Sequence, residues 1–228
     1  MELEAWLGQA RGSPWTLYTY WGHLSGFYRW ADRRELSYNP MVDLTRPRYP
    51  RTDPRLASED QVAVGLALRE PYRRAVLLAA FQGLRAGEIA RLRREHVTAD
   101  WMTLQRKGGY GQTVPTQPIV WDELAGLPPG PVVPRPTDGG HFRPAALSRA
   151  LSRQLAGAGL SRITLHWYRH RFATMLLLPV ELGGAGASLR VVQELLGHLS
   201  VASTQRYTWI TDAQQRAALA RLPVPAVG

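Results

Sequence analysis

Four short segments combine arginine, lysine, histidine and tyrosine residues whose types could do chemistry together. They are GLRAGEIARL at 83–92, QRKGGYGQTVP at 105–115, LHWYRHRFAT at 165–174 and LLGHLSVASTQRYT at 195–208. An arginine presents a planar fork of donors to anionic oxygens, a histidine moves protons near neutral pH, and a tyrosine can act as a nucleophile. Such a set, gathered around one anionic group, suits phosphoryl transfer without a metal ion.

Taken alone, one of the pairs in these segments has a simpler explanation. Arg85 and Glu88 stand three residues apart at a helix start, which is the spacing of an ordinary ion pair. The alternative is an arginine presented to phosphate beside a helix N-terminus, with Glu88 supporting it. His166 and Arg169 are also one helical turn apart, which places an imidazole and a guanidinium on one face.

His166 and His170 have the i,i+4 spacing of a zinc-binding motif. However, Trp167 follows His166 where that motif has its general-base glutamate. The sequence has no cysteine, and no acidic third ligand lies nearby downstream. We therefore disfavour a zinc site and expect the protein to need no metal or other cofactor.

Lys107 is the only lysine among 28 basic residues. A chain that otherwise uses arginine would retain a lysine by chance, or where an ammonium must give up a proton, which a guanidinium cannot do. His198 follows Gly197 at a predicted helix end, where interaction with the helix dipole is the simpler explanation. Tyr207 lies in a polar stretch, and by itself would be taken for an ordinary surface tyrosine.

The composition favours a polyanionic partner. The formal net charge is +10 and the pI is about 10.6, which suits nucleic acid, although a charged surface that keeps the protein in solution is the alternative. No apolar run is long enough for a transmembrane helix, and the N-terminus does not resemble a signal peptide. The absence of cysteine fits a reducing compartment, and we expect a cytoplasmic protein.

Periodicity and turn residues predict a mainly α fold with one small β-hairpin or sheet. Ser13-Pro14 should cap a helix, and Ser58 with Gln61 has the form of a capping box. The predicted helices are 14–31, 58–68, 71–83, 144–155, 165–178, 189–196, 203–207 and 212–222, and the predicted strands are 101–105 and 112–116. Residues 127–140 are rich in proline and glycine and predict a loop.

Together the four segments resemble the tyrosine recombinases, the family of phage integrases and chromosome-dimer resolvases. The resemblance covers nearly all of 58–228, in the right order. GLRAGEIARL is similar to the first-arginine box, RKGGYGQTVP to the lysine-bearing hairpin, HWYR to the H-x-x-R box, and LLGH with Tyr207 to the final histidine and nucleophile. Residues 1–44 resemble a shortened helical core-binding domain, and 45–57 a basic linker, which implies a small integrase with a catalytic domain at 58–228.

The resemblance implies that Tyr207 attacks a DNA phosphodiester and forms a 3′-phosphotyrosyl link. Arg85 and Arg169 would hold the non-bridging oxygens with help from His198. His166 would act as acid or base, and Lys107 would protonate the 5′-oxygen as it leaves. The expected partners are double-stranded DNA attachment sites and, on two duplexes, a homotetramer of the chain, which is otherwise a monomer or weak dimer. The linker arginines expected to contact DNA are Arg46, Arg48, Arg51 and Arg55.

A phage or prophage integrase of a bacterial host is the function that we favour. The nearest alternatives are a type IB topoisomerase, which uses similar chemistry, and a non-catalytic DNA-binding regulator derived from an integrase. Two features depart from the family. Arg171 stands where a small hydroxyl residue is common, and 176–188 is longer than the usual connection between helices. The segment at 212–222 could dock on a neighbouring protomer or pack within its own chain.

Overall fold

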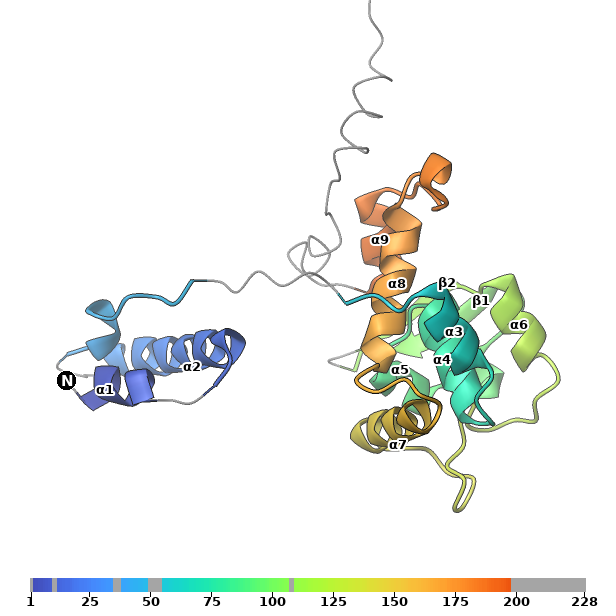
Figure 1. Ribbon diagram of the computed structural model, residues 1–228, viewed down its shortest axis with the longest axis horizontal. Coiled ribbons are helices and arrows are strands. Elements are labelled where there is room, and N and C mark those ends of the chain that lie inside the picture. Colours follow the sequence, from blue (N-terminus) through green and yellow to red (C-terminus); the bar gives the residue numbers. More distant parts are fainter. Residues whose placement is uncertain (1, 10–11, 35–37, 49–54, 107–108, 198–228) are drawn as a thin grey trace, which may run out of the picture. The chain divides into compact units, whose positions relative to one another are not determined.

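The computed structural model divides the chain into two compact units, Met1–Asp53 and Pro54–Gly228. The residues that it describes are 2–9, 12–34, 38–48, 55–106 and 109–197 (Figure 1). The predicted helices at 203–207 and 212–222 therefore lie outside the described residues. In the described part, no helix has the length and apolar character needed to cross a membrane.

The first unit contains helices α1 (Glu2–Gln9) and α2 (Pro14–Asp32) and the short 3-10 helix η1 (Pro40–Val42). Ser13 caps α2 as predicted, because its side chain accepts a hydrogen bond from the Thr16 N–H. No residue of α2 is buried, and its predicted apolar stripe is only half-buried. The assignment of this unit as a core-binding domain stays a prediction.

The second unit is built around α4 (Tyr72–Phe81), which packs against α3 (Glu59–Leu66) and α8 (Leu165–Leu177) (Figure 1). Most of α4 is buried, as its apolar sequence predicts. The capping box at the start of α3 is confirmed, since Ser58 and Gln61 each bond the other's backbone N–H. From α8, the Tyr168 hydroxyl donates to the Gln61 carbonyl at 3.0 Å and ties the two helices together.

We expect Tyr168→Phe to lower the free energy of unfolding by about 1 kcal/mol, the usual contribution of one hydrogen bond. Burial raises the pKa of the Tyr168 phenol to about 12. Because this folded-state pKa is above the ordinary value of 10.0, the contribution is complete below pH 10 and is lost as the pH rises toward 12. Urea unfolding from pH 8 to 12 should therefore show that the difference in free energy of unfolding between the native chain and the variant becomes smaller as the pH rises. A gap that stays constant would contradict this assignment, and the exposed Tyr110→Phe is the control.

A two-stranded antiparallel sheet pairs β1 (Trp101–Gln105) with β2 (Gly111–Pro115). The register sets Trp101 opposite Pro115 and Gln105 opposite Gly111. One face of the hairpin is buried through Met102, Leu104 and Val114. The first strand is as predicted, and β2 begins and ends one residue earlier. The mainly α fold with a small sheet is therefore confirmed.

The remaining elements of the second unit are α5 (Ala86–Arg91), η2 (Arg94–His96), α6 (Pro118–Leu124), α7 (Pro144–Gly157), η3 (Val180–Leu182) and α9 (Leu189–Leu196). Amphipathic α7 buries Leu147, Ala150, Leu151 and Leu155 and packs on α5. Helix α9 has the predicted bounds and ends at Gly197, which is left-handed with φ of 59°. Neither α6 nor α1 was predicted from the sequence.

The two departures from the family pattern are accommodated within the second unit. Arg171 lies 3.4 Å from Glu59 at the start of α3, as an exposed ion pair. The connection at 176–188 folds back on the end of α8, where the Ala185 and Ala187 N–H groups donate to the carbonyls of Met175 and Leu176. The long connection therefore continues the packing of α8 up to the start of α9.

Candidate active site

The turn between α4 and α5 presents Arg85. Gly83, with φ of 66°, closes α4 in a left-handed conformation that permits this turn, and Arg85 is the N-cap residue of α5. The Arg85 backbone N–H donates to Glu88 Oε2 at 2.8 Å, and its Nη1 donates to Glu88 Oε1 at 2.8 Å. These bonds hold the guanidinium in place. It remains accessible, because 35% of the Arg85 side chain is exposed.

Arg169 of α8 bonds to the turn after α4 and to the end of α9. Its Nη1 donates to the Gly83 carbonyl, and its Nη2 donates to the Leu196 carbonyl at 2.9 Å. Arg85 Nη1 also donates to Leu196 O, at 3.1 Å. A single carbonyl oxygen at the end of α9 thus accepts from both guanidinium groups, although the two arginines are far apart in sequence.

Glu88 is the anionic centre of the cluster. Its carboxylate lies 2.8 Å from Arg85 Nη1, 2.9 Å from Arg106 Nη1 and 3.6 Å from Arg169 Nη1, and only 2% of its side chain is exposed. Burial would raise the pKa of Glu88, but Arg106, the Arg85 N–H and Arg169 outweigh that effect and lower the pKa below its ordinary range. The i,i+3 ion pair considered above is present, and it is one part of a larger network.

His166 lies one turn before Arg169 on α8 and is exposed. Its ring stands 4.0 Å from that of His170, centroid to centroid, at an interplanar angle of 73°. Within the described residues, no group of three or more His, Cys, Asp or Glu side chains is placed to hold a metal ion. Lys107, His198 and Tyr207 lie outside the described residues, so their predicted roles stay predictions.

Arg106 also belongs to this cluster and was not identified from the sequence. Its side chain is 1% exposed, its Nε donates to Gln112 Oε1 at 2.8 Å, and its Nη2 donates to the Leu195 carbonyl at 2.8 Å. The contact with Glu88 is an ion pair by distance and lacks hydrogen-bond geometry. Its position directly before Lys107 was the one available signal, because Glu88 and Leu195, two of the three partners of its side chain, come from other elements of the unit.

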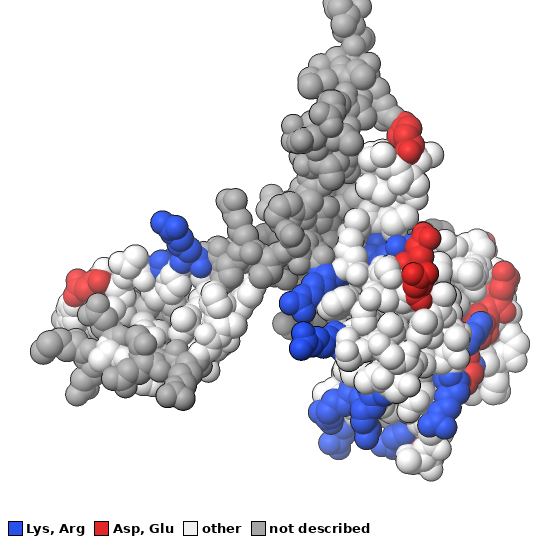
Figure 2. Space-filling model, viewed as in Figure 1, with Lys and Arg blue, Asp and Glu red and all other residues white. Residues whose placement is uncertain are grey.

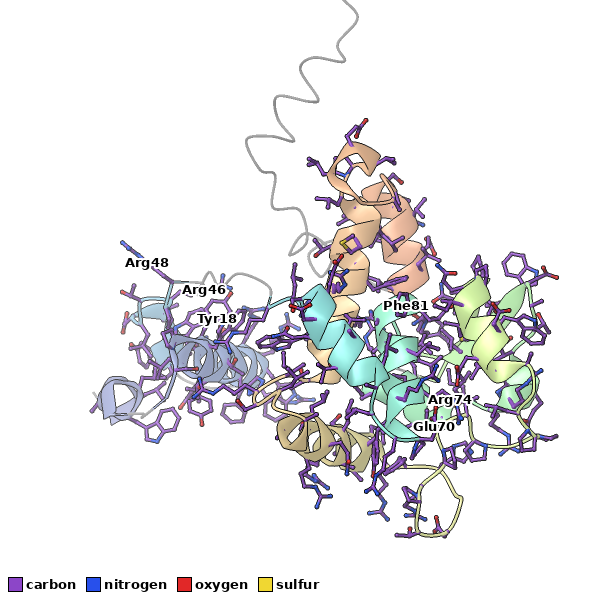
Figure 3. All side chains as sticks on the ribbon, turned by 45° about the vertical axis from the view of Figure 1, so that its right-hand side comes forward. Tyr18, Arg46, Arg48, Glu70, Arg74 and Phe81 are labelled. Atoms are coloured by element: carbon purple, nitrogen blue, oxygen red, sulfur yellow. The ribbon has the colours of Figure 1, made fainter. Side chains whose placement is uncertain are left out.

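The predicted DNA-contacting arginines are distributed over both units. In the first unit, Arg46 lies over the rings of Tyr18 and Trp21, 5.1 and 5.4 Å from their centroids, and Arg48 extends outward (Figure 3). In the second unit, Arg55 lies 5.7 Å from the Trp167 ring. Arg51 falls outside the described residues. Their contacts with DNA stay predictions.

Comparison with known proteins identifies relatives across most of the chain. The profile described as the phage integrase family matches residues 135–214. The tyrosine recombinase XerC of Rhodospirillum centenum is 35% identical over 206 residues, which make up 80% of this chain and 58% of that protein. The chain thus spans less than two thirds of the length of this curated relative.

Solved structures give the same result. The integrase from mycobacterium phage Brujita is 34% identical, with a TM-score of 0.56, over 95% of this chain and 75% of that one. A lambda integrase tetramer bound to a Holliday junction is 18% identical, with a TM-score of 0.65, over 87% of this chain and 62% of that one. At that identity, the second comparison speaks for the fold alone.

Proposed function

Because this chain belongs to the tyrosine recombinases of the phage integrase family, we propose that it cuts and rejoins DNA at specific sites through a covalent link to Tyr207. The observation that carries the proposal is the convergence of Arg85 and Arg169 on one oxygen, the Leu196 carbonyl, beside the buried Glu88. Two guanidinium groups that meet at one acceptor suit a phosphodiester, whose single negative charge is shared by two non-bridging oxygens.

In the proposed reaction the Tyr207 hydroxyl attacks phosphorus and loses its proton to His166. The bond from phosphorus to the 5′-oxygen breaks, and Lys107 gives that oxygen a proton. The products are a 3′-phosphotyrosyl link and a free 5′-hydroxyl, and attack by a second 5′-hydroxyl reverses the step. One phosphoester bond is broken and another is formed in each step, so the exchange needs no nucleotide to drive it, and in the proposed scheme side chains do the chemistry without a metal ion.

The arginines contribute differently to this reaction. Arg85 is 35% exposed and can contact a phosphate oxygen directly, with His198 donating a further hydrogen bond. Arg169 is 1% exposed, so its contact with phosphate requires the site to open when DNA binds. Glu88 fixes the orientation of both guanidinium groups. Charge on the surface of the second unit supports DNA as the partner. Arg143, which precedes α7, and Arg149 and Arg153 within α7 are exposed, and basic side chains gather over that part of the second unit (Figure 2).

We further propose integration and excision of a phage genome in the bacterial cytoplasm, by a tetramer on two duplexes. The similarity to the Brujita integrase over 95% of this chain supports the phage role. The tetramer is proposed by analogy with the lambda integrase tetramer on a Holliday junction, whose fold this chain shares. Recombination between two unlike attachment sites would support integration. Reaction only between identical sites would favour resolution of chromosome dimers, and supercoil relaxation without site pairing would favour a topoisomerase.

The direct test is to trap the covalent intermediate. The purified chain is incubated, with EDTA and without nucleotide, with a nicked duplex that carries the site selected by the chain itself. We expect a covalent protein–DNA adduct, and we expect Tyr207→Phe to abolish it, because phenylalanine has no oxygen to esterify. The adduct should persist in Tyr72→Phe, which removes a hydroxyl from α4. Trapping that survives Tyr207→Phe would overturn the proposal.

A further inference from the structure

We propose that Arg106 is a positioning residue that locks the base of the β1–β2 hairpin onto the end of α9 and so places Lys107 for proton transfer. The inference rests on the proposed function for the role of Lys107, which follows Arg106 directly in the chain. It assigns a task to a buried charge that the proposed reaction does not use.

The side chain of Arg106 bridges three separate parts of the second unit. Nε donates to Gln112 of β2, Nη2 donates to the Leu195 carbonyl of α9, and Nη1 is 2.9 Å from Glu88 of α5. The three interactions leave in different directions from one planar group. A lysine would provide a single ammonium in its place and could not span all three partners.

Gln112 strengthens the attachment from the second strand. It accepts from Arg106 Nε, and its own Nε2 donates to the Glu194 carbonyl of α9 at 2.8 Å. Residues on both sides of the hairpin turn are therefore bonded to the last turn of α9, where the Leu195 carbonyl accepts from Arg106 and the Glu194 carbonyl accepts from Gln112. The hairpin base is held by side chains that bond to the end of a helix.

The backbone of Arg106 is bonded to residues that follow Lys107 in the sequence. Its N–H donates to the Tyr110 carbonyl at 3.0 Å, and its carbonyl accepts from the Gly109 N–H at 3.1 Å. Fixing the side chain of Arg106 thus fixes the backbone from which the next residue extends. Lys107 needs such support because a proton donor must lie within hydrogen-bond reach of the departing oxygen.

Close packing at the end of α9 supports the same conclusion. A Cβ added to Gly197 would lie 2.6 Å from Arg106 Nε and 2.8 Å from Gln112 Oε1. No side chain fits there without displacing the arginine, so the hairpin and the residue before His198 are in direct contact. Arg106 therefore links the parts of the chain that bear Lys107 and His198.

The test compares two leaving groups at the scissile phosphate. One nicked duplex has the normal 5′-bridging oxygen, and the other has a 5′-bridging sulfur, which leaves as a thiolate and needs no protonation. Lys107→Ala is the reference, expected to be slow on oxygen and restored on sulfur. We expect Arg106→Lys and Gln112→Leu to cleave the oxygen substrate on the order of 10²-fold more slowly, the effect of ångström-scale misplacement, and to recover on sulfur to within a few-fold of the native chain.

The use of two different variants separates a loss of positioning from a loss of folding. Arg106→Lys keeps a positive charge near Glu88, and Gln112→Leu leaves the Arg106–Glu88 pair intact, so at least one variant should retain the native melting temperature. Thr113→Ala, next to Gln112 but exposed, is the matched control and should cleave both substrates normally. Suppose that the sulfur substrate rescues Lys107→Ala. The inference is then overturned if the Arg106 and Gln112 variants cleave the sulfur substrate slowly, or if they cleave the oxygen substrate at the native rate. Failure to rescue Lys107→Ala would refute the role proposed for Lys107 itself, and the inference with it.

Discussion

Lys107→Arg is expected to bind its DNA site as tightly as the native chain and to cleave it roughly 10²- to 10⁴-fold more slowly, the range that general acid catalysis contributes. The substitution keeps the positive charge, so the attraction to the phosphate backbone is unchanged. A guanidinium does not release a proton at accessible pH, so the 5′-oxygen would have to leave as an alkoxide. Binding by gel shift and single-turnover cleavage of a nicked site would measure the two effects separately.

The sulfur-bridged substrate distinguishes the loss of the proton donor from a general disruption of the active site. Lys107→Arg should cleave it nearly as fast as the native chain does, since a thiolate leaves unaided. Arg73→Lys, which exchanges the same two residue types in α4, is the control and should leave both rates unchanged. Near-normal cleavage of the oxygen substrate by Lys107→Arg would show that the single lysine of the sequence is coincidental.

Glu88→Gln is expected to lower the free energy of unfolding by roughly 3–5 kcal/mol, the usual cost of removing one partner from a buried ion pair. The reason is that Arg106 and Arg169, each 1% exposed, would lose the carboxylate that they share. In a chain of this size, the melting temperature should fall on the order of 10 °C. Thermal unfolding at pH 7 would measure the change.

The loss of stability caused by Glu88→Gln should become smaller as the pH falls. Since the folded state lowers the pKa of Glu88 below its ordinary value of 4.5, the carboxylate contributes stability above that pH, and the contribution is lost as the pH falls. The stability gap between native chain and variant should therefore narrow from pH 6 to pH 3. Glu59→Gln, whose carboxylate forms an exposed pair with Arg171, should change the stability by less than about 1 kcal/mol. A Glu88→Gln effect that small would refute the central role of Glu88.

The elements predicted well from sequence are those whose signals are local. Helix α9 repeats its apolar residues at helical spacing and ends in Gly197, and α3 carries its capping box within four residues. Helix α6 was missed because it has only 7 residues and no side-chain cap at Gln117. The shift of β2 by one residue is a boundary that alternation alone does not define.

The candidate site shows the same division. Arg85, Glu88 and Arg169 were identified from their segments, and the structure brings all three together. Two contacts could not be predicted because the residues that form them are distant in the sequence. Arg106 donates to the Leu195 carbonyl 89 positions away, and Arg85 donates to the Leu196 carbonyl 111 positions away. Periodicity describes which face of an element is buried, and it carries no information about which distant carbonyl an arginine will meet.

Three guanidinium groups surround one carboxylate in the described cluster, so Arg85, Arg106 and Arg169 together with Glu88 carry a net charge of +2. Their mutual repulsion works against the fold that holds them, and a bound phosphate would relieve part of it. A ligand that binds only the folded chain also stabilises it against unfolding, so the proposed DNA partner should raise the melting temperature in proportion to its affinity and concentration. The excess positive charge of the cluster therefore favours the binding of an anion.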